Sequence, residues 1–326
     1  MVQQHYLKLA GALLAALAVI WGAPAQAQQW PSKPVRIIVP FGAGGGTDIQ
    51  GRLLAQKFQQ SLGQNFLVEN RSGASGLIGA EIAARSPGDG YTILFTTASL
   101  AVSVTLNSKL LKFDPNTDLL PISWVSSVPL VLTLHPSVPA KNLREFIALA
   151  KKSAGKLNAA HNGAGTTSHL SVEMLNLFAG TKVTPIPYKG GGPAMIGQIS
   201  GETDFTFATA LAVQPFIKSG KVRVIAVTTA KPAAAFPGLP TMSSIYPEFE
   251  ADNWYAMFFP KGTPRDIVTR MNGEIINGLK APEVNDFIRK EGGEPIGSTP
   301  EELAAYFKRE TVKYAKIIKA ANVQAE

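Results

Sequence analysis

The sequence contains no cysteine among its 326 residues. Disulfides, thiol catalysis and thiolate metal sites are therefore excluded, as is a lipidated cysteine behind a signal peptide. The sequence also lacks dense basic runs, since no run of Lys or Arg is longer than the pair Lys151 and Lys152. The formal net charge of +8 is thus spread along the chain. This spacing indicates a mild attraction for small anions and no nucleic-acid partner.

Long apolar runs are equally scarce. The apolar stretch at residues 9–21 follows Lys8, precedes an Ala-Gln-Ala sequence ending at Ala27, and is too short to span a bilayer. These features predict a signal peptide over residues 1–27, removed after about Ala27, with a membrane anchor as the alternative. We therefore expect a mature chain of net charge +7, free in the periplasm.

The sequence offers little for catalysis or for metal binding. His135, His161 and His169 form no H-x-x-x-H pattern, and no acidic cluster accompanies them. A G-x-S-x-G nucleophile motif is also absent. We expect no metal, no cofactor and no enzymatic activity. The alternative is an exported hydrolase or isomerase that uses Asp48 and His169.

Residues 35–62 are the most informative stretch. A buried strand is predicted at 35–39, a turn with four glycines at 41–46, and an amphipathic helix after it. Thr47 and Gln50 fit a capping box, so we expect the helix to begin at Thr47 or Asp48. A glycine-rich turn at a helix N-terminus exposes several backbone N–H groups, which together form an anion site.

Three other interpretations of this turn are a nucleotide site, a purely structural turn and a catalytic site that uses Asp48. The sequence of the turn matches neither the P-loop motif nor the dinucleotide-binding fingerprint, which argues against a nucleotide as the ligand. The glycines could instead serve only a tight turn. Asp48 could be a general base, or it could simply complement the helix dipole from the first turn.

Strands and helices then alternate with short connections, which predicts parallel α/β sheets. Strands at 66–70 and 91–97 follow the first helix, and Thr97 and Ser99 should share a rim with the glycine turn. The pattern restarts near residue 128, with a strand predicted at 128–135 and another at 157–161. A small-residue turn follows, and His169 at the helix start behind it could donate to an anion or could be purely structural. Two such turns facing each other could hold both ends of a small anion.

We expect two domains, residues 28–127 plus 251–326 and residues 128–250. The chain would cross between them near residues 128 and 250, as a two-strand hinge. An aromatic stretch at 253–260 is predicted as a buried strand. The helices that follow it up to residue 320 should pack on the first domain.

Laid out in this way, the chain resembles the tripartite tricarboxylate transporter solute receptors, the Bug-type receptors. The resemblance covers essentially the whole mature chain, and its most specific pieces lie at 30–48, 68–81, 86–95, 163–170, 187–194 and 253–264. It implies an α/β, two-domain periplasmic binding protein of the type II-like, Venus-flytrap kind. Each domain would be a mainly parallel sheet flanked by helices. Such a receptor closes on a small carboxylate, a dicarboxylate or an aromatic one, and passes it to membrane permease subunits.

The resemblance also assigns ligand contacts by motif. They are Phe41, Gly42, Ala43, Gly44, Gly45, Gly46, Asp48, Thr97, Ser99, Thr166, Thr167, Ser168, His169 and Thr209. Family members commonly carry Asn or Asp near Thr209, and the loop expected after Thr97 lacks the His and Asn often found there. The far end of the ligand is therefore expected to be less polar. We expect a monomer, and a receptor serving a signalling partner remains an alternative to transport.

Overall fold

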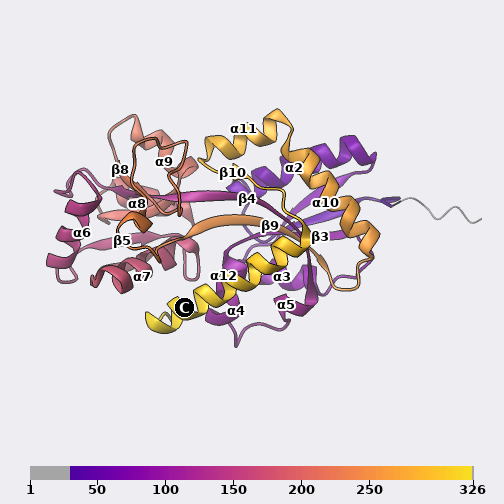
Figure 1. Cartoon of the computed structure of the whole chain (residues 1–326), viewed down its shortest axis with the longest axis horizontal. Helices are drawn as coiled ribbons and strands as arrows, with labels where there is room; N and C mark the ends of the chain where they lie inside the picture. The colour runs from indigo at the N-terminus through magenta and orange to yellow at the C-terminus, as the bar shows by residue number, and fades with distance from the viewer. Residues whose placement is uncertain (1–29, 325–326) are drawn as a thin grey trace, which may run out of the picture. The chain divides into compact units, whose positions relative to one another are not determined.

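The computed structural model describes residues 30–324, so the predicted signal peptide and its cleavage point lie outside the described residues. Its elements are shown in Figure 1. In chain order they are β1 (Val35–Val39), α2 (Gly46–Leu62), β2 (Phe66–Asn70), η1 (Ala74–Gly76), α3 (Leu77–Ala84), β3 (Thr92–Thr97), α4 (Ser99–Leu106), α5 (Pro115–Asp118), β4 (Leu119–Leu134), α6 (Leu143–Lys152), β5 (Asn158–His161), α7 (Thr167–Ala179), β6 (Thr184–Pro187), α8 (Gly191–Ile199), β7 (Phe205–Thr209), α9 (Ala210–Ile217), β8 (Arg223–Val227), η2 (Met242–Ser244), β9 (Asp252–Pro260), α10 (Arg265–Leu279), α11 (Pro282–Lys290), β10 (Glu294–Pro295) and α12 (Pro300–Ala320).

The strands form a mixed sheet in the order β2-β1-β3-β9-β4-β7-β5-β6, and β8 and β10 also pair with β4. The pairs β1/β2, β1/β3, β5/β6 and β5/β7 are parallel, as the short strand-helix alternation predicts. Strands β4 and β9 run antiparallel to their neighbours. The α/β class is confirmed, with these two long strands adding the antiparallel part.

Strand β4 belongs to both halves of the sheet. From Leu119 to Pro129 it pairs with β9, and from Leu130 to Leu134 it pairs with β7 and β8. Pro129 lies opposite Asp252, the first residue of β9. In Figure 1, β4 and β9 run as neighbouring ribbons between the elements around β3 and those around β5. The predicted crossings near residues 128 and 250 fall at this position, while the division into two domains stays a prediction.

Two expectations about local structure are wrong. The segment after Thr97 is not a loop, because helix α4 begins at Ser99. The strand expected at residue 128 begins nine residues earlier, at Leu119. Polar residues such as Ser123 and Ser126 obscure that part of β4 in the sequence. Both are fully buried and their hydroxyls are hydrogen-bonded, to the carbonyl of Ser298 and to the side chain of Gln50.

The aromatic stretch is confirmed as the buried strand β9. Every residue from Trp254 to Phe259 is at most 2% exposed. Helix α12 covers it, with Tyr306 against the edge of Trp254 at 5.7 Å and stacked on Trp124 at 3.8 Å. Burying one large apolar side chain contributes about 1.5–3 kcal/mol. As expected, α10 and α11 pack on α2, whereas α12 packs on α4 and also reaches α7.

Candidate functional site

The first glycine turn connects β1 to α2, and its residues from Gly42 to Gly45 are exposed to solvent. Gly44 has a φ of +83°, while Gly45 is extended and occupies the N-cap without any side-chain cap. The first N–H groups of α2, on Gly46 and Thr47, have no acceptor within the helix. With the helix dipole behind them, they have the arrangement of a generic anion site, and binding of an anion here stays a prediction.

The predicted capping box of this helix is wrong. Helix α2 begins at Gly46, and Thr47 caps nothing. Gln50 instead donates to the buried carboxyl of Glu291 at 3.0 Å and accepts from Ser126 at 2.8 Å. Gly46 is held closely from this side, since an added Cβ would lie 2.7 Å from the hydroxyl of Tyr255 and 2.9 Å from Glu291 Oε1.

Asp48 braces the turn. Its Oδ2 accepts from the N–H of Gly44 at 2.9 Å, and its Oδ1 accepts from Arg52 and from Asn70, each at 3.0 Å. Asn70 also donates to the carbonyl of Phe41 at 3.0 Å. Burial alone would raise the pKa of Asp48, but these hydrogen bonds, that of Arg52 foremost, hold it below its ordinary value. A carboxylate bound in this way favours the structural interpretation over a general base.

Thr97 and Ser99 mark the junction of β3 and α4. Both are buried, and the N–H of Ser99 and its hydroxyl lie 3.4 Å from Oγ1 of Thr97. This junction resembles the glycine turn in form, because a strand again leads directly onto the start of a helix. Thr209 occupies a third such junction, at the N-cap of α9, where its side chain makes no cap hydrogen bond.

The second predicted turn connects β5 to α7. Thr166 is the N-cap of α7, and its hydroxyl accepts from the N–H of His169 at 3.3 Å and donates to the carbonyl of Gly163 at 2.8 Å. Ser168 donates to the carbonyl of Phe207 in β7 at 2.6 Å, so its hydroxyl fixes the helix to the sheet. The N–H groups of Thr167 and Ser168 have no acceptor within the helix.

The two histidines of this turn lie together. His161 and His169 stack at 4.3 Å between ring centres with an interplanar angle of 18°. Their Nδ1 atoms accept from the N–H groups of Gly163 at 3.3 Å and of Gly165 at 3.2 Å. Burial, together with the neighbouring ring of His169, lowers the pKa of His161 to about 4.

A short segment that sequence reasoning missed links the two turns. Residues 73–76 all have positive φ, including Ala74 at +46° and Ser75 at +54°. The ring of Phe41 lies against Gly76, with 3.2 Å between Cζ and an added Cβ. Ser75 donates to the carbonyl of Ala164 in the second turn at 2.7 Å. The glycines at both ends of Gly-Ala-Ser-Gly could have indicated a left-handed backbone in this segment, because glycine readily takes positive φ.

Helix α4 meets the second turn as well. A Cβ added to Gly165 would lie 3.0 Å from Leu106 and 3.7 Å from Val102, both on α4. Helix α4 thus contacts the second turn through residues beyond Ser99, and the second turn is linked to the segment at 73–76 through Ser75. Non-glycine residues with positive φ are uncommon and concentrate at functional positions.

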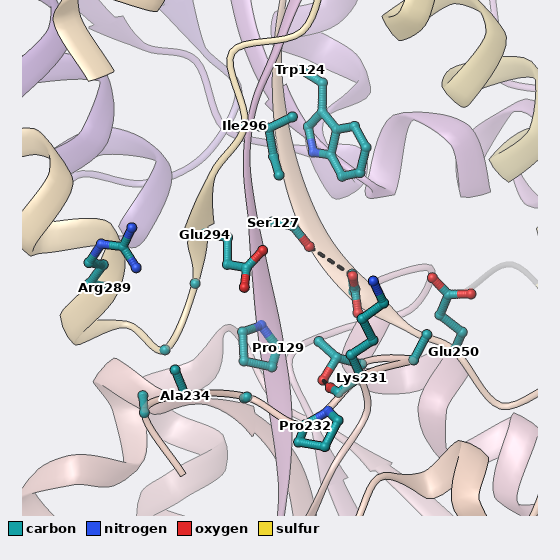
Figure 2. A pocket seen from close by; sticks show the side chains of 17 residues that line it. Trp124, Ser127, Pro129, Lys231, Pro232, Ala234, Glu250, Arg289, Glu294 and Ile296 are labelled. Atoms are coloured by element: carbon teal, nitrogen blue, oxygen red, sulfur yellow. Dashed lines mark hydrogen bonds between the residues drawn. The ribbon is translucent and has the colours of Figure 1, made fainter. Parts of the chain in front are cut away.

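A separate cavity of about 450 Å³ lies where β4 passes from one half of the sheet to the other. Figure 2 shows its labelled walls, with Trp124 and Ile296 at one end and Lys231, Pro232 and Glu250 at the other. The dashed line marks the hydrogen bond from Ser127 to Asp252, whose pKa burial raises to about 7. None of the sequence-predicted contacts lines this cavity.

Residues 30–324 contain no group of three His, Asp or Glu side chains placed to hold a metal ion. Within the same range, no helix combines the length and the apolar character needed to cross a bilayer.

Comparison with known proteins decides the family. Residues 51–323 match the tripartite tricarboxylate transporter family receptor. The chain belongs to this family. BugT of Bordetella pertussis is 36% identical over 300 residues, which is 91% of this chain and 92% of BugT.

Solved structures of this receptor family share the fold. The structure described as R. palustris Rpa4515 with adipate has 32% identity and a TM-score of 0.82, covering 90% of this chain and 99% of that one. MatC from Rhodopseudomonas palustris with bound malate has 28% identity and a TM-score of 0.79, covering 89% and 100%. The chain is therefore a solute-binding receptor with the periplasmic binding protein fold, as the sequence motifs predict. Receptors of this family are periplasmic and are not enzymes.

Proposed function

We propose that this receptor captures a small carboxylate, a dicarboxylate or an aromatic one, in the periplasm and delivers it to a tripartite tricarboxylate-type permease. The observation that carries the proposal is the pair of helix N-termini, on α2 and α7, whose turns are linked through Ser75. Relatives of this chain have been described with adipate and with malate, both of which carry a carboxylate at each end. Two anion sites are suited to a ligand of that form.

Neither turn contains Arg or Lys, so the carboxylate would be bound by backbone N–H groups and hydroxyls. The N–H groups of Gly46 and Thr47 would bind one end, and those of Thr167 and Ser168 the other. Phe41 and the exposed residues from Gly42 to Gly45 would form the wall of the first turn. Asp48, Thr166 and His169 contact the turns themselves, so we assign them a supporting role.

Capture would proceed by closure about β4 and β9. We retain residues 28–127 plus 251–326 as one domain and 128–250 as the other, because β4 changes partners between Pro129 and Leu130. Contacts made across the two domains only in the closed form would favour that form when ligand is bound. A permease could then distinguish loaded from empty receptor by shape.

Thermal unfolding of the mature chain, residues 28–326, tests ligand capture. A panel of mono-, di-, tri- and aromatic carboxylates should include at least one that raises Tm in proportion to ln(1 + [L]/Kd). The stabilisation is about 2.7 kcal/mol at a ligand concentration of 100 Kd. If no carboxylate raises Tm and native mass spectrometry finds no co-purified ligand, carboxylate capture is wrong.

Delivery needs a separate test. Uptake of the bound carboxylate by cells that carry the permease subunits should require this receptor and be lost on its deletion. Uptake that persists without the receptor, with altered gene expression instead, would favour a signalling role.

A further inference from the structure

Two stacked histidines, His161 and His169, both contact the backbone of the second turn. A role for His169 as a ligand contact does not explain these contacts. His161 ends β5 and is 1% exposed, and His169 lies in the first turn of α7 and is 7% exposed. Each ring places Nδ1 against a backbone N–H of the same turn, that of Gly163 or that of Gly165. The two rings therefore bind the turn at alternate residues.

The hydrogen bonds fix which nitrogen of each neutral ring carries the hydrogen. A nitrogen that accepts from an N–H carries no proton, so each neutral ring must have its hydrogen on Nε2. For His169 that nitrogen lies 3.5 Å from Oε1 of Glu173, one turn along α7. The lowered pKa of His161 agrees with a neutral ring. An imidazolium would place an N–H against an N–H and would also oppose the positive end of the helix dipole.

The same contacts leave specific amides available. Within the turn, the N–H groups of Gly163 and Gly165 are used by the rings, and the carbonyl of Ala164 is used by Ser75. The N–H groups of Thr167 and Ser168, at the start of α7, remain for an anion. The φ angles of Gly163 and Gly165, +121° and +72°, allow the backbone to take this path.

We propose that His161 and His169 are positioning residues, whose neutral rings accept backbone N–H groups and so direct the first amides of α7 at the bound carboxylate. This inference rests on the proposed carboxylate receptor. It changes the role predicted for His169, from a donor to the ligand to an acceptor from the turn. It also adds His161, to which the sequence motifs assign no role. Because the two rings stack, moving one ring removes the packing surface of the other.

Paired substitutions separate the acceptor from the bulk of the ring. His161→Phe and His169→Phe keep an aromatic ring and the stack but remove Nδ1. His161→Asn and His169→Asn place an amide oxygen close to the position of Nδ1. The probe is adipate or malate, whichever raises the wild-type Tm more, and Kd is measured by calorimetry. We expect the Phe variants to bind about tenfold more weakly and the Asn variants to stay within about threefold of wild type.

The Tm of each variant without ligand shows that it is folded. Binding by a Phe variant equal to that of wild type, or an equal loss in the Phe and Asn variants, would overturn the proposal. If the Phe variants do not fold, NMR of the wild-type protein without ligand still tests the proposal. Long-range ¹H–¹⁵N NMR spectra of the wild-type histidines should show Nε2–H tautomers for both rings at neutral pH. An Nδ1–H tautomer or an imidazolium at either residue overturns the proposal, whether or not a carboxylate binds. If wild type binds no carboxylate of the panel, the proposed function fails by a separate measurement.

Discussion

The hydroxyl of Ser75 and the carbonyl of Ala164, 89 residues apart in the chain, form a hydrogen bond of 2.7 Å. The bond joins the left-handed segment 73–76 to the turn that precedes α7. Ser75 is held at a φ of +54°, a conformation that costs an L-residue about 1–2 kcal/mol. A second bond, from Gln214 Nε2 to the carbonyl of Lys290 at 2.6 Å, also joins the two proposed domains. Strain at such a contact leads to the prediction that Ser75 contributes to binding.

Replacing Ser75 by Ala should speed ligand release. The loss of one hydrogen bond, worth about 1 kcal/mol, corresponds to about a fivefold higher dissociation rate if the bond forms on closure. Stopped-flow fluorescence of the tryptophans measures this rate. The association rate should change less, because the bond would form after the ligand has bound.

Ser86→Ala is the matched control. The hydroxyl of Ser86 donates to the carbonyl of Ile82 at 2.8 Å at the end of α3, far along the chain from the second turn. This variant should release ligand at the wild-type rate. If Ser75→Ala lowers the Tm without ligand and leaves the dissociation rate unchanged, the Ser75 bond stabilises the fold and does not contribute to closure.

The glycines of the first turn should differ sharply in their tolerance of a side chain. A Cβ at Gly46 would contact Tyr255 and Glu291, whereas a Cβ at Gly45 meets only the carbonyl of Gly42 at 3.8 Å. Gly46→Ala should therefore destabilise the protein by about 1–3 kcal/mol, and Gly45→Ala should be close to neutral. Chemical denaturation measures both. Adding Tyr255→Phe to Gly46→Ala should restore part of the loss, and a loss that is unchanged would place the strain elsewhere.

This contrast corrects an expectation from the sequence. The sequence suggests that Gly45 and Gly46 both need positive φ, so that a β-branched residue at either position would weaken binding of an anion by the backbone N–H groups. In the structure only Gly44 of this turn has it. Four glycines in one turn indicate a tight backbone, but which of them tolerates a side chain depends on contacts from residues 255 and 291. Those residues are more than 200 positions away, and no local pattern reveals them.

Much of the remaining site could be predicted because its signals are local. Strand–turn–helix patterns placed both turns, and the cap formed by Thr166 follows from the same logic. The link through Ser75 could not be predicted, since Ser75 and Ala164 meet only after the sheet has formed. The acceptor role of the histidines was missed for a related reason. A ring beside an anion site suggests a donor, and only the positions of the Gly163 and Gly165 amides reveal the opposite polarity.

Asp48→Asn should lower stability at neutral pH and weaken binding. The carboxylate accepts from Gly44, Arg52 and Asn70, and an amide cannot replace all three bonds or the charge. Because the pKa of Asp48 is lowered in the folded state, its contribution is present above its ordinary pKa of 3.8. The difference in free energy of unfolding between wild type and variant should therefore narrow as the pH falls below about 4.

Asp266→Asn serves as the control for this prediction, because Asp266 lies in the first turn of α10, apart from both turns of the site. If Asp48→Asn binds carboxylates as wild type does, the brace on the first turn is dispensable. Retained binding with loss of a turnover activity would instead favour the catalytic alternative.

Glu291 should make the stability of the receptor depend on pH near neutrality. Its side chain is buried behind the first turn, and burial raises its pKa from 4.5 to about 7 despite the hydrogen bond from Gln50. Between these two pH values the folded protein holds a proton that the unfolded chain has lost. The free energy of unfolding must therefore fall as the pH rises through this window.

Glu291→Gln removes the titration and keeps an oxygen that can accept from Gln50. Wild type should match the variant near pH 5 and be less stable than it near pH 8, by on the order of 2–3 kcal/mol. Urea denaturation at a series of pH values measures the difference. A difference that stays constant with pH would mean that Glu291 is ionised throughout. It would then place a fixed negative charge beside Gly46, which would oppose an anion at the start of α2.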